Sequence, residues 1–246
     1  MKKLLFLSTL LFIGLTLSGC FHKKTTNLQT SKSTASESPQ INFQNPKKSA
    51  HYESNTPEHG STLAQVPVNV VINFNFDLAK PSNISITKDG KEYGIGETTI
   101  DTNKLTLRRN VAQGAPNGIY TVNYKACWPD GSCHEGSFQF AIDRSKTAEY
   151  VNMTNQSAVT IDMIDITFVP RNIKISKGTK VTWTNSNSVS HYVNTDSHPA
   201  HTYLLDQNSK ELKPGDSYTY TFVSSGIYPY HCSAHAEQMV GQILVE

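Results

Sequence analysis

Four side chains of types that bind copper in proteins lie in the last third of this 246-residue chain. Cys232, His235 and Met239 stand close together in the run Y-H-C-S-A-H-A-E-Q-M, and His191 stands well upstream of them. A thiolate, two imidazoles and a weak thioether form the ligand set of a type 1 (blue) copper site. Three ligands on one short loop, with a fourth on another strand, would hold the geometry nearly fixed while the metal changes charge. That property serves one-electron transfer, although a cysteine beside a histidine is more often a buried thiol near a surface imidazole.

The segments around these residues favour strands. Four runs alternate apolar and polar residues and are rich in β-branched and aromatic side chains, which favours β-structure over helix. These runs are residues 159–168, 180–184, 217–222 and 241–245. A β-sandwich would therefore position the candidate ligands.

Residues 159–246 resemble a cupredoxin of the plastocyanin and amicyanin type. The resemblance rests on I-T-F-V-P-R-N-I-K-I-S-K-G-T-K-V-T-W-T-N, L-K-P-G-D-S-Y-T-Y-T-F and G-I-Y-P-Y-H-C. It implies a Greek-key β-sandwich with one type 1 copper as cofactor. The copper ligands of that family carry over onto His191, Cys232, His235 and Met239.

The loop between Cys232 and His235 departs from the resemblance at one position. Many relatives have Pro there, whereas this chain has Ala234, whose backbone N–H a Pro would lack. A hydrogen bond from that N–H would disperse charge from the thiolate, favour Cu(I) and raise the reduction potential. We therefore predict that Ala234 donates to the sulfur of Cys232.

The N-terminal sequence predicts that the protein is located outside the cytoplasm. Two lysines precede an apolar stretch, residues 4–17, which is too short for a typical membrane-spanning helix. The run L-S-G-C that follows resembles the bacterial lipobox, which implies cleavage before Cys20 and a lipid on its sulfur. Residues 1–20 would then be a lipoprotein signal peptide, and the protein would be lipid-anchored in the periplasm or at the cell surface. The alternative is an ordinary signal peptide with an incidental cysteine.

Residues 21–50 are mostly Ser, Thr, Lys, Asn and Gln, with few large apolar side chains. Such a composition cannot bury enough surface to offset chain entropy, so we expect a disordered tether. Of the 22 basic side chains two leave with the signal peptide, so that basic and acidic side chains balance at 20 each. This near-neutrality gives no reason to expect nucleic acid as a partner.

Residues 51–143 predict a second domain, also of strands, with turns at K-D-G, P-N-G and P-D-G. The order of motifs resembles the CopC copper-resistance family, through H-Y-E-S-N-T-P-E-H-G, G-I-Y-T-V-N-Y and G-S-F-Q-F. The resemblance implies an immunoglobulin-like Greek-key sandwich. The expected fold class is therefore all-β, with two sandwiches joined by a linker over residues 144–158.

Only some of the copper ligands that the CopC resemblance implies have counterparts in this sequence. His51, Asp130 and His134 are candidates for a second, Cu(II) site, while the alternative is a sandwich that serves as a spacer or docking module. Cys127 and Cys133 bracket the turn W-P-D-G-S, which would place them opposite each other on neighbouring strands, within reach of a disulfide. The alternative there is a Cu(I) thiolate site.

Three further histidines stand near the ligand motif. His198 and His201, in the run H-P-A-H, could bind a metal, contact a partner or simply be solvated. His231 precedes Cys232, so in a strand it points to the opposite face, and we predict no functional role for it.

Two classes of function fit these observations. The copper motif favours a carrier of single electrons between redox partner proteins, and the CopC resemblance favours a copper chaperone or resistance protein with copper donor or acceptor proteins as partners. A copper enzyme fits poorly, because such enzymes need additional His-rich copper motifs.

Overall fold

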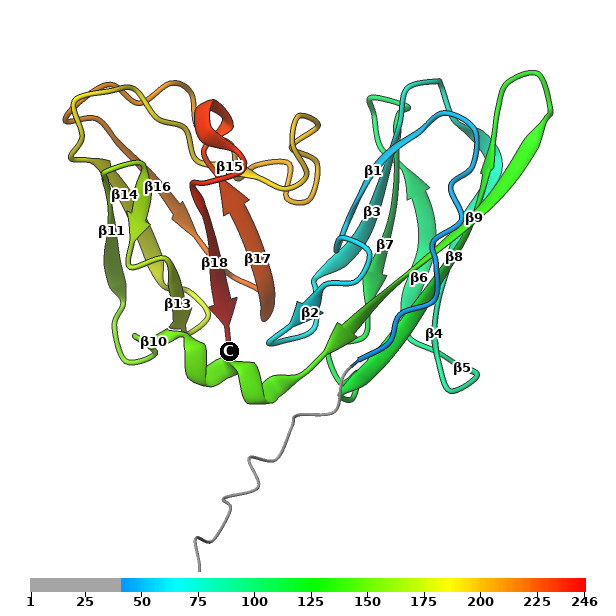
Figure 1. Cartoon of the computed structure of the whole chain (residues 1–246), viewed down its shortest axis with the longest axis horizontal. Helices are drawn as coiled ribbons and strands as arrows, with labels where there is room; N and C mark the ends of the chain where they lie inside the picture. The colour runs from blue at the N-terminus through cyan, green and yellow to red at the C-terminus, as the bar shows by residue number, and fades with distance from the viewer. Residues whose placement is uncertain (1–40) are drawn as a thin grey trace, which may run out of the picture. The chain divides into compact units, whose positions relative to one another are not determined.

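The computed structural model describes residues 41–246, and their regular structure is almost entirely β. Two β-sandwiches follow each other along the chain, with a short 3-10 helix between them (Figure 1). The predicted all-β, two-sandwich fold class is thus confirmed. The predicted signal peptide, Cys20 and most of the predicted tether lie outside the described residues.

The first sandwich is made of two sheets with the strand orders β1-β3-β7-β6 and β2-β9-β8-β4-β5. Their bounds are β1 Tyr52–Thr56, β2 Thr62–Leu63, β3 Asn69–Phe74, β4 Ala79–Lys88, β5 Lys91–Glu92, β6 Gly94–Ile100, β7 Thr106–Val111, β8 Gly118–Cys127 and β9 Cys133–Ile142. Inward-facing apolar side chains such as Ile72, Leu107 and Phe140 are fully buried between the sheets. Alternation along each strand thus supplies the core that the sequence pattern predicts.

The hairpin of β8 and β9 ends in a disulfide between Cys127 and Cys133. The two residues are directly paired in the ladder, and their Cα atoms lie 4.0 Å apart. Gly131 takes a φ of +87° in the turn between them, a conformation that glycine adopts at little cost.

Part of the predicted tether is ordered. Lys47 exchanges two backbone hydrogen bonds with Ser137 of β9, both at 2.8 Å, and the N–H of Gln44 donates to the Gln139 side chain at 2.7 Å. The tether prediction for residues 21–50 is therefore wrong for this last stretch. A polar segment orders here because β9 offers unpaired backbone groups that the composition of the segment does not reveal.

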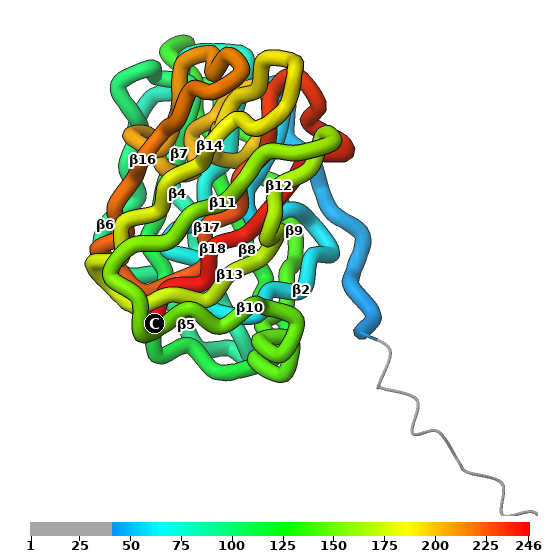
Figure 2. The backbone as a smooth tube through the Cα atoms, turned by 90° about the vertical axis from the view of Figure 1, so that its left-hand side faces the viewer, coloured from blue at the N-terminus to red at the C-terminus, as the bar shows by residue number. Residues whose placement is uncertain are grey.

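The second sandwich also has two sheets, in the orders β10-β13-β18-β17-β15 and β12-β11-β14-β16. Their bounds are β10 Val151–Asn152, β11 Ala158–Ile164, β12 Thr167–Val169, β13 Asn172–Ile175, β14 Lys180–Asn185, β15 Asn194–Thr195, β16 Ser217–Thr221, β17 Gly226–His231 and β18 Val240–Val245. The sheet of β11, β12, β14 and β16 faces the viewer in Figure 2. Trp183, Phe168 and Tyr230 are buried in this sandwich, and the ring of Tyr230 contacts the rings of the other two.

The segment predicted as a linker, residues 144–158, has structure of its own. It contains the 3-10 helix η1, Arg144–Glu149, and then β10, which pairs in parallel with β13. Asp143 caps η1 by accepting a hydrogen bond from the N–H of Ser145. The linker therefore adds an edge strand to the second sandwich.

Apolar side chains of the two sandwiches pack together. Ile227 of β17 and Leu244 of β18 belong to the buried cluster of the first sandwich, and Val71 of β3 belongs to that of the second. The buried hydroxyl of Tyr203 accepts from the N–H of Val68 at 2.9 Å and donates to the carbonyl of Ile227 at 2.7 Å. No helix in residues 41–246 has the length and apolar character needed to span a bilayer.

Candidate metal centre

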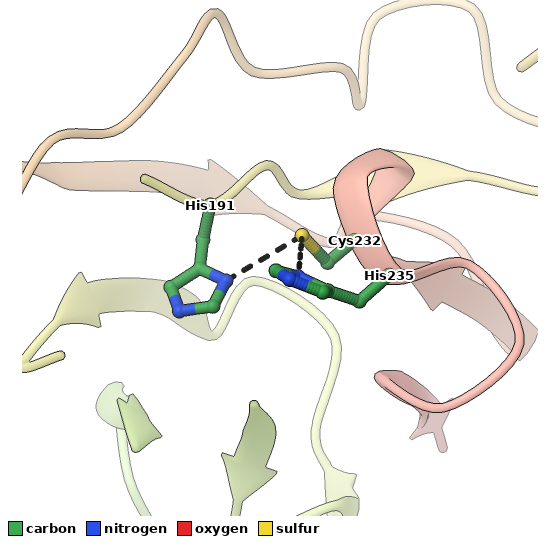
Figure 3. A group of neighbouring side chains, drawn as sticks. All are labelled: His191, Cys232 and His235. Atoms are coloured by element: carbon green, nitrogen blue, oxygen red, sulfur yellow. Dashed lines mark hydrogen bonds between the residues drawn. The ribbon is translucent and has the colours of Figure 1, made fainter. Parts of the chain in front are cut away.

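Three of the four predicted type 1 copper ligands converge in the second sandwich. Cys232 directly follows β17, His235 ends the 3-10 helix η2, Ser233–His235, and His191 lies after β14 in an isolated bridge with Leu212. The Nδ1 atoms of both histidines lie 3.6 Å from the sulfur of Cys232, and Figure 3 shows both rings turned toward it. One ligand atom from each residue lies within 4.8 Å of the other two.

The donor atoms suit copper. Cys232 is the free cysteine of residues 41–246, and it has no exposed surface. Burial and the nearby His235 lower the pKa of His191, so its imidazole is neutral at pH 7 and has a lone pair to donate. His191 Nε2 is buried with no hydrogen-bond partner in the described part of the chain, which leaves Nδ1 as the nitrogen that faces the sulfur. A buried thiol between two imidazoles is a soft, mixed N/S site of the kind that copper prefers.

The ligand loop is held by its own backbone. The N–H of Cys232 donates to the carbonyl of Met239, and the N–H of Met239 donates to the carbonyl of His235, both at 2.9 Å. The N–H of His235 donates to the carbonyl of Cys232 at 2.8 Å. Met239 is fully buried at the end of this loop, and its role as the axial ligand stays a prediction.

The hydrogen bond to the thiolate comes from a different residue than predicted. The N–H of Tyr192 donates to the sulfur at 3.3 Å. Cys232 stands at the N-cap of η2, yet its side chain accepts no capping hydrogen bond, so the prediction for Ala234 is wrong. The residue after His191 supplies the donor because its segment passes beside the ligand loop, a tertiary contact that spacing along the chain does not encode.

The candidate Cu(II) site of the first sandwich is not gathered in the structure. Among residues 41–246, His51, Asp130 and His134 do not form a group whose ligand atoms converge. His51 Nδ1 instead lies 2.9 Å from Asn75 Oδ1, and the carboxylate of Asp130 accepts from the N–H and hydroxyl of Ser132. The site stays a prediction that the geometry does not support.

A second group of converging ligand atoms does exist, in His198, His201 and His231. Sequence reasoning placed the first two on a loop and gave His231 no role. The pairing of β15 with β17 sets Asn194 opposite His231, so the loop after β15 turns back over that side chain. The sequence did contain a signal for His231. Alternation along a strand directs its side chain away from that of Cys232, toward the side where this loop lies.

Comparison with known proteins agrees with both sandwiches. A family model described as copper binding proteins of the plastocyanin/azurin family matches residues 155–246. A CopC domain model matches residues 52–143. The two resemblances drawn from the sequence are confirmed, in the predicted order.

Individual relatives match the second sandwich. A chloroplastic plastocyanin of Tetradesmus obliquus is 34% identical over 112 residues, which cover 44% of this chain and 73% of that protein. A plastocyanin of Mercurialis perennis is 31% identical over 88 residues, covering 33% and 89% respectively. The solved structure of a purple cupredoxin from Nitrosopumilus maritimus is 31% identical, covers 36% of this chain and 99% of its own, and gives a TM-score of 0.33.

Proposed function

Because the chain belongs to the plastocyanin/azurin family of copper binding proteins and has a CopC domain ahead of that match, we propose that it is a type 1 copper protein for one-electron transfer. At the coarser level, it is a copper-binding protein of the electron-transfer or copper-handling class. The observation that carries the finer proposal is the convergence of His191, Cys232 and His235 on one point.

Burial and rigidity support the electron-transfer role. An ion held by these residues would sit in a largely buried site whose ligand loop is fixed by its own hydrogen bonds. Fixed ligands need little rearrangement when the charge of the site changes, which favours fast exchange of single electrons. The partners would be redox proteins that approach the ligand loop. Met239 would be the weak axial ligand of the copper.

We further propose that the protein works outside the cytoplasm, anchored by a lipid on Cys20. The disulfide between Cys127 and Cys133 supports an oxidising compartment. Replacing Cys20 with Ala should release the protein from the membrane fraction, as immunoblotting of fractionated cells would report. Equal membrane retention of the C20A variant would contradict the anchor.

Copper delivery is the second candidate function, and the CopC match favours it. The two roles differ in what leaves the protein. A carrier releases electrons and keeps its metal through many redox cycles, whereas a chaperone loses copper to an acceptor.

The test uses residues 21–246 loaded with Cu(II). We expect an intense visible band from thiolate-to-copper charge transfer, which the C232S variant should lack while its circular dichroism is unchanged. The control is the C127S/C133S double variant, which should keep the band. Repeated reduction and reoxidation without loss of copper supports electron transfer, and copper loss to a Cu(I) chelator within one cycle supports delivery. A band that persists in the C232S variant would contradict the thiolate assignment.

A further inference from the structure

The three histidines on the far side of Cys232 are arranged as metal ligands. One ring nitrogen of each of His198, His201 and His231 lies within 4.8 Å of the others. His201 Nε2 lies 3.4 Å from His198 Nδ1. Two nitrogens that bind one ion at about 2.0 Å each lie at most about 4 Å apart, so small side-chain rotations complete the geometry.

His231 is held in the orientation that a metal ligand requires. Its side chain is 2% exposed, and its Nδ1 lies 2.9 Å from a carboxylate oxygen of Asp196. Its Nε2 is buried and has no hydrogen-bond partner in residues 41–246. A carboxylate that fixes one ring nitrogen and leaves the other free is the usual support of a metal-bound histidine. An unpaired buried nitrogen is otherwise costly, so this atom points to a ligand.

His201 is prepared in a similar way. Burial, together with the neighbouring His231 and His198, lowers the pKa of His201 to about 4, although Asp196 opposes the shift. His201 Nε2 lies 3.0 Å from the hydroxyl of Ser233, which is the residue that follows Cys232.

The first sandwich holds the loop that carries His198 and His201. The hydroxyl of Ser197 accepts from the side-chain amide of Asn73 in β3 at 3.1 Å and lies 2.7 Å from the hydroxyl of Ser54 in β1. The hydroxyl of Thr202 donates to the same Asn73 side chain at 2.8 Å. Residues on both sides of the two histidines are thus tied to β1 and β3.

Arg108 of β7 also holds the end of this loop, through hydrogen bonds from its charged side chain. Its guanidinium donates to the carbonyl of Thr202 at 2.5 Å and to that of Tyr203 at 3.0 Å. Asp101 fixes the guanidinium through a contact of 2.6 Å between largely buried side chains. Side chains of the first sandwich thus hold this loop of the second sandwich in place.

A groove of about 800 Å³ gives access to two of the three histidines. His198 and His231 line it beside Asp196, and Tyr52, Glu53 and His59 line it from the first sandwich. His198 is exposed, so an ion can reach the cluster from solvent.

We propose that His198, His201 and His231 bind a second copper ion, as Cu(II), in a site distinct from the thiolate site. Three imidazoles without a thiolate suit Cu(II), and nitrogen ligands bind Cu²⁺ more tightly than the other divalent first-row metals. His231 and Cys232 are adjacent in the chain, so one peptide unit links the two sites. With copper held at both sites, this short covalent path would let one electron pass from Cu(I) at Cys232 to Cu(II) at the three histidines.

The test counts copper and electrons on the whole chain from residue 21. The wild type should bind two copper ions that show two electron paramagnetic resonance signals, and reductive titration should consume two electrons per chain. In each of the H198A and H201N variants we expect one bound copper ion and one electron consumed per chain. Of the two electron paramagnetic resonance signals, the one from copper without a thiolate ligand should disappear. Asn is chosen at position 201 because the backbone there has a φ of +50°, which Asn tolerates.

Matched variants separate this site from the others. His59 lines the same groove outside the cluster, so the H59A variant should keep both copper ions. The H51A/H134A double variant should keep them as well. The C232S variant should lose the visible band and keep the second signal, so the proposal does not depend on the thiolate site. An unchanged copper count and signal in both H198A and H201N, with the visible band intact, would overturn it.

Discussion

Three groups from two parts of the chain lie within reach of the sulfur of Cys232. Two imidazole nitrogens and the N–H of Tyr192 approach it directly. The N–H of Cys232 itself bonds to Met239, which closes the loop around the sulfur. The ligand types were predictable because they stand in a characteristic order. The N–H of Tyr192 was not, because a backbone donor leaves no trace in residue type.

Removing the N–H of Tyr192 should lower the reduction potential of the thiolate site. A hydrogen bond to a charged group contributes about 1.5–3 kcal/mol, and only its differential effect on the two oxidation states counts. We expect the Y192P variant to shift downward by on the order of tens of millivolts, since about 59 mV corresponds to a tenfold change for one electron. Voltammetry at one pH measures the shift.

Two control variants accompany that prediction. Y192A keeps the N–H and should leave the potential near that of the wild type. A234P removes an N–H that does not reach the sulfur, so it should also have little effect. A drop in A234P that equals the drop in Y192P would contradict the assigned donor.

At the scale of elements, strand pairing determines which segments lie side by side, and the sequence pattern does not predict this. Alternation in β17 predicts that His231 and Cys232 point to opposite faces, and they do so, each into a different histidine pair. What alternation cannot state is which loop covers the face of His231. That information lies in the pairing of β15 with β17 and in the hydrogen bonds from Asn73 and Arg108.

The β8–β9 hairpin permits a test of the alternative to its disulfide. Closing a loop of this length is expected to stabilise the fold by about 2 kcal/mol, through the entropy of the unfolded chain. The C127S/C133S double variant should lose about that free energy of unfolding in urea titrations. Its copper content should equal that of the wild type, and a loss of one copper would indicate a thiolate site at these cysteines instead.

For the whole molecule, the sequence predicts two sandwiches but not their contact. The run of β3 was predictable as a strand, with Val70, Ile72 and Phe74 facing its own core. The side chain of Val71 points away from that core. If the first sandwich were a domain on its own, Val71 would be an apolar residue on its surface. The structure buries it in the cluster of the second sandwich. Contacts between domains join segments far apart in the sequence, so neither periodicity nor motif spacing predicts them.

The shared packing leads us to expect that the two sandwiches unfold together. Tyr203 is the most direct link, because its hydroxyl bonds to Val68 in one sandwich and Ile227 in the other. The Y203F variant leaves the partly buried N–H of Val68 without its partner, which costs on the order of 1 kcal/mol. Calorimetry should show a single transition in the wild type, shifted to lower temperature in Y203F. The Y220F control removes a hydroxyl that contacts Asp206 at the exposed surface and should change little. Because a surface contact of this kind contributes less than a buried one, equal shifts in the two variants would contradict the role assigned to the Tyr203 hydroxyl. Two separate transitions in the wild type would mean that the sandwiches are energetically independent.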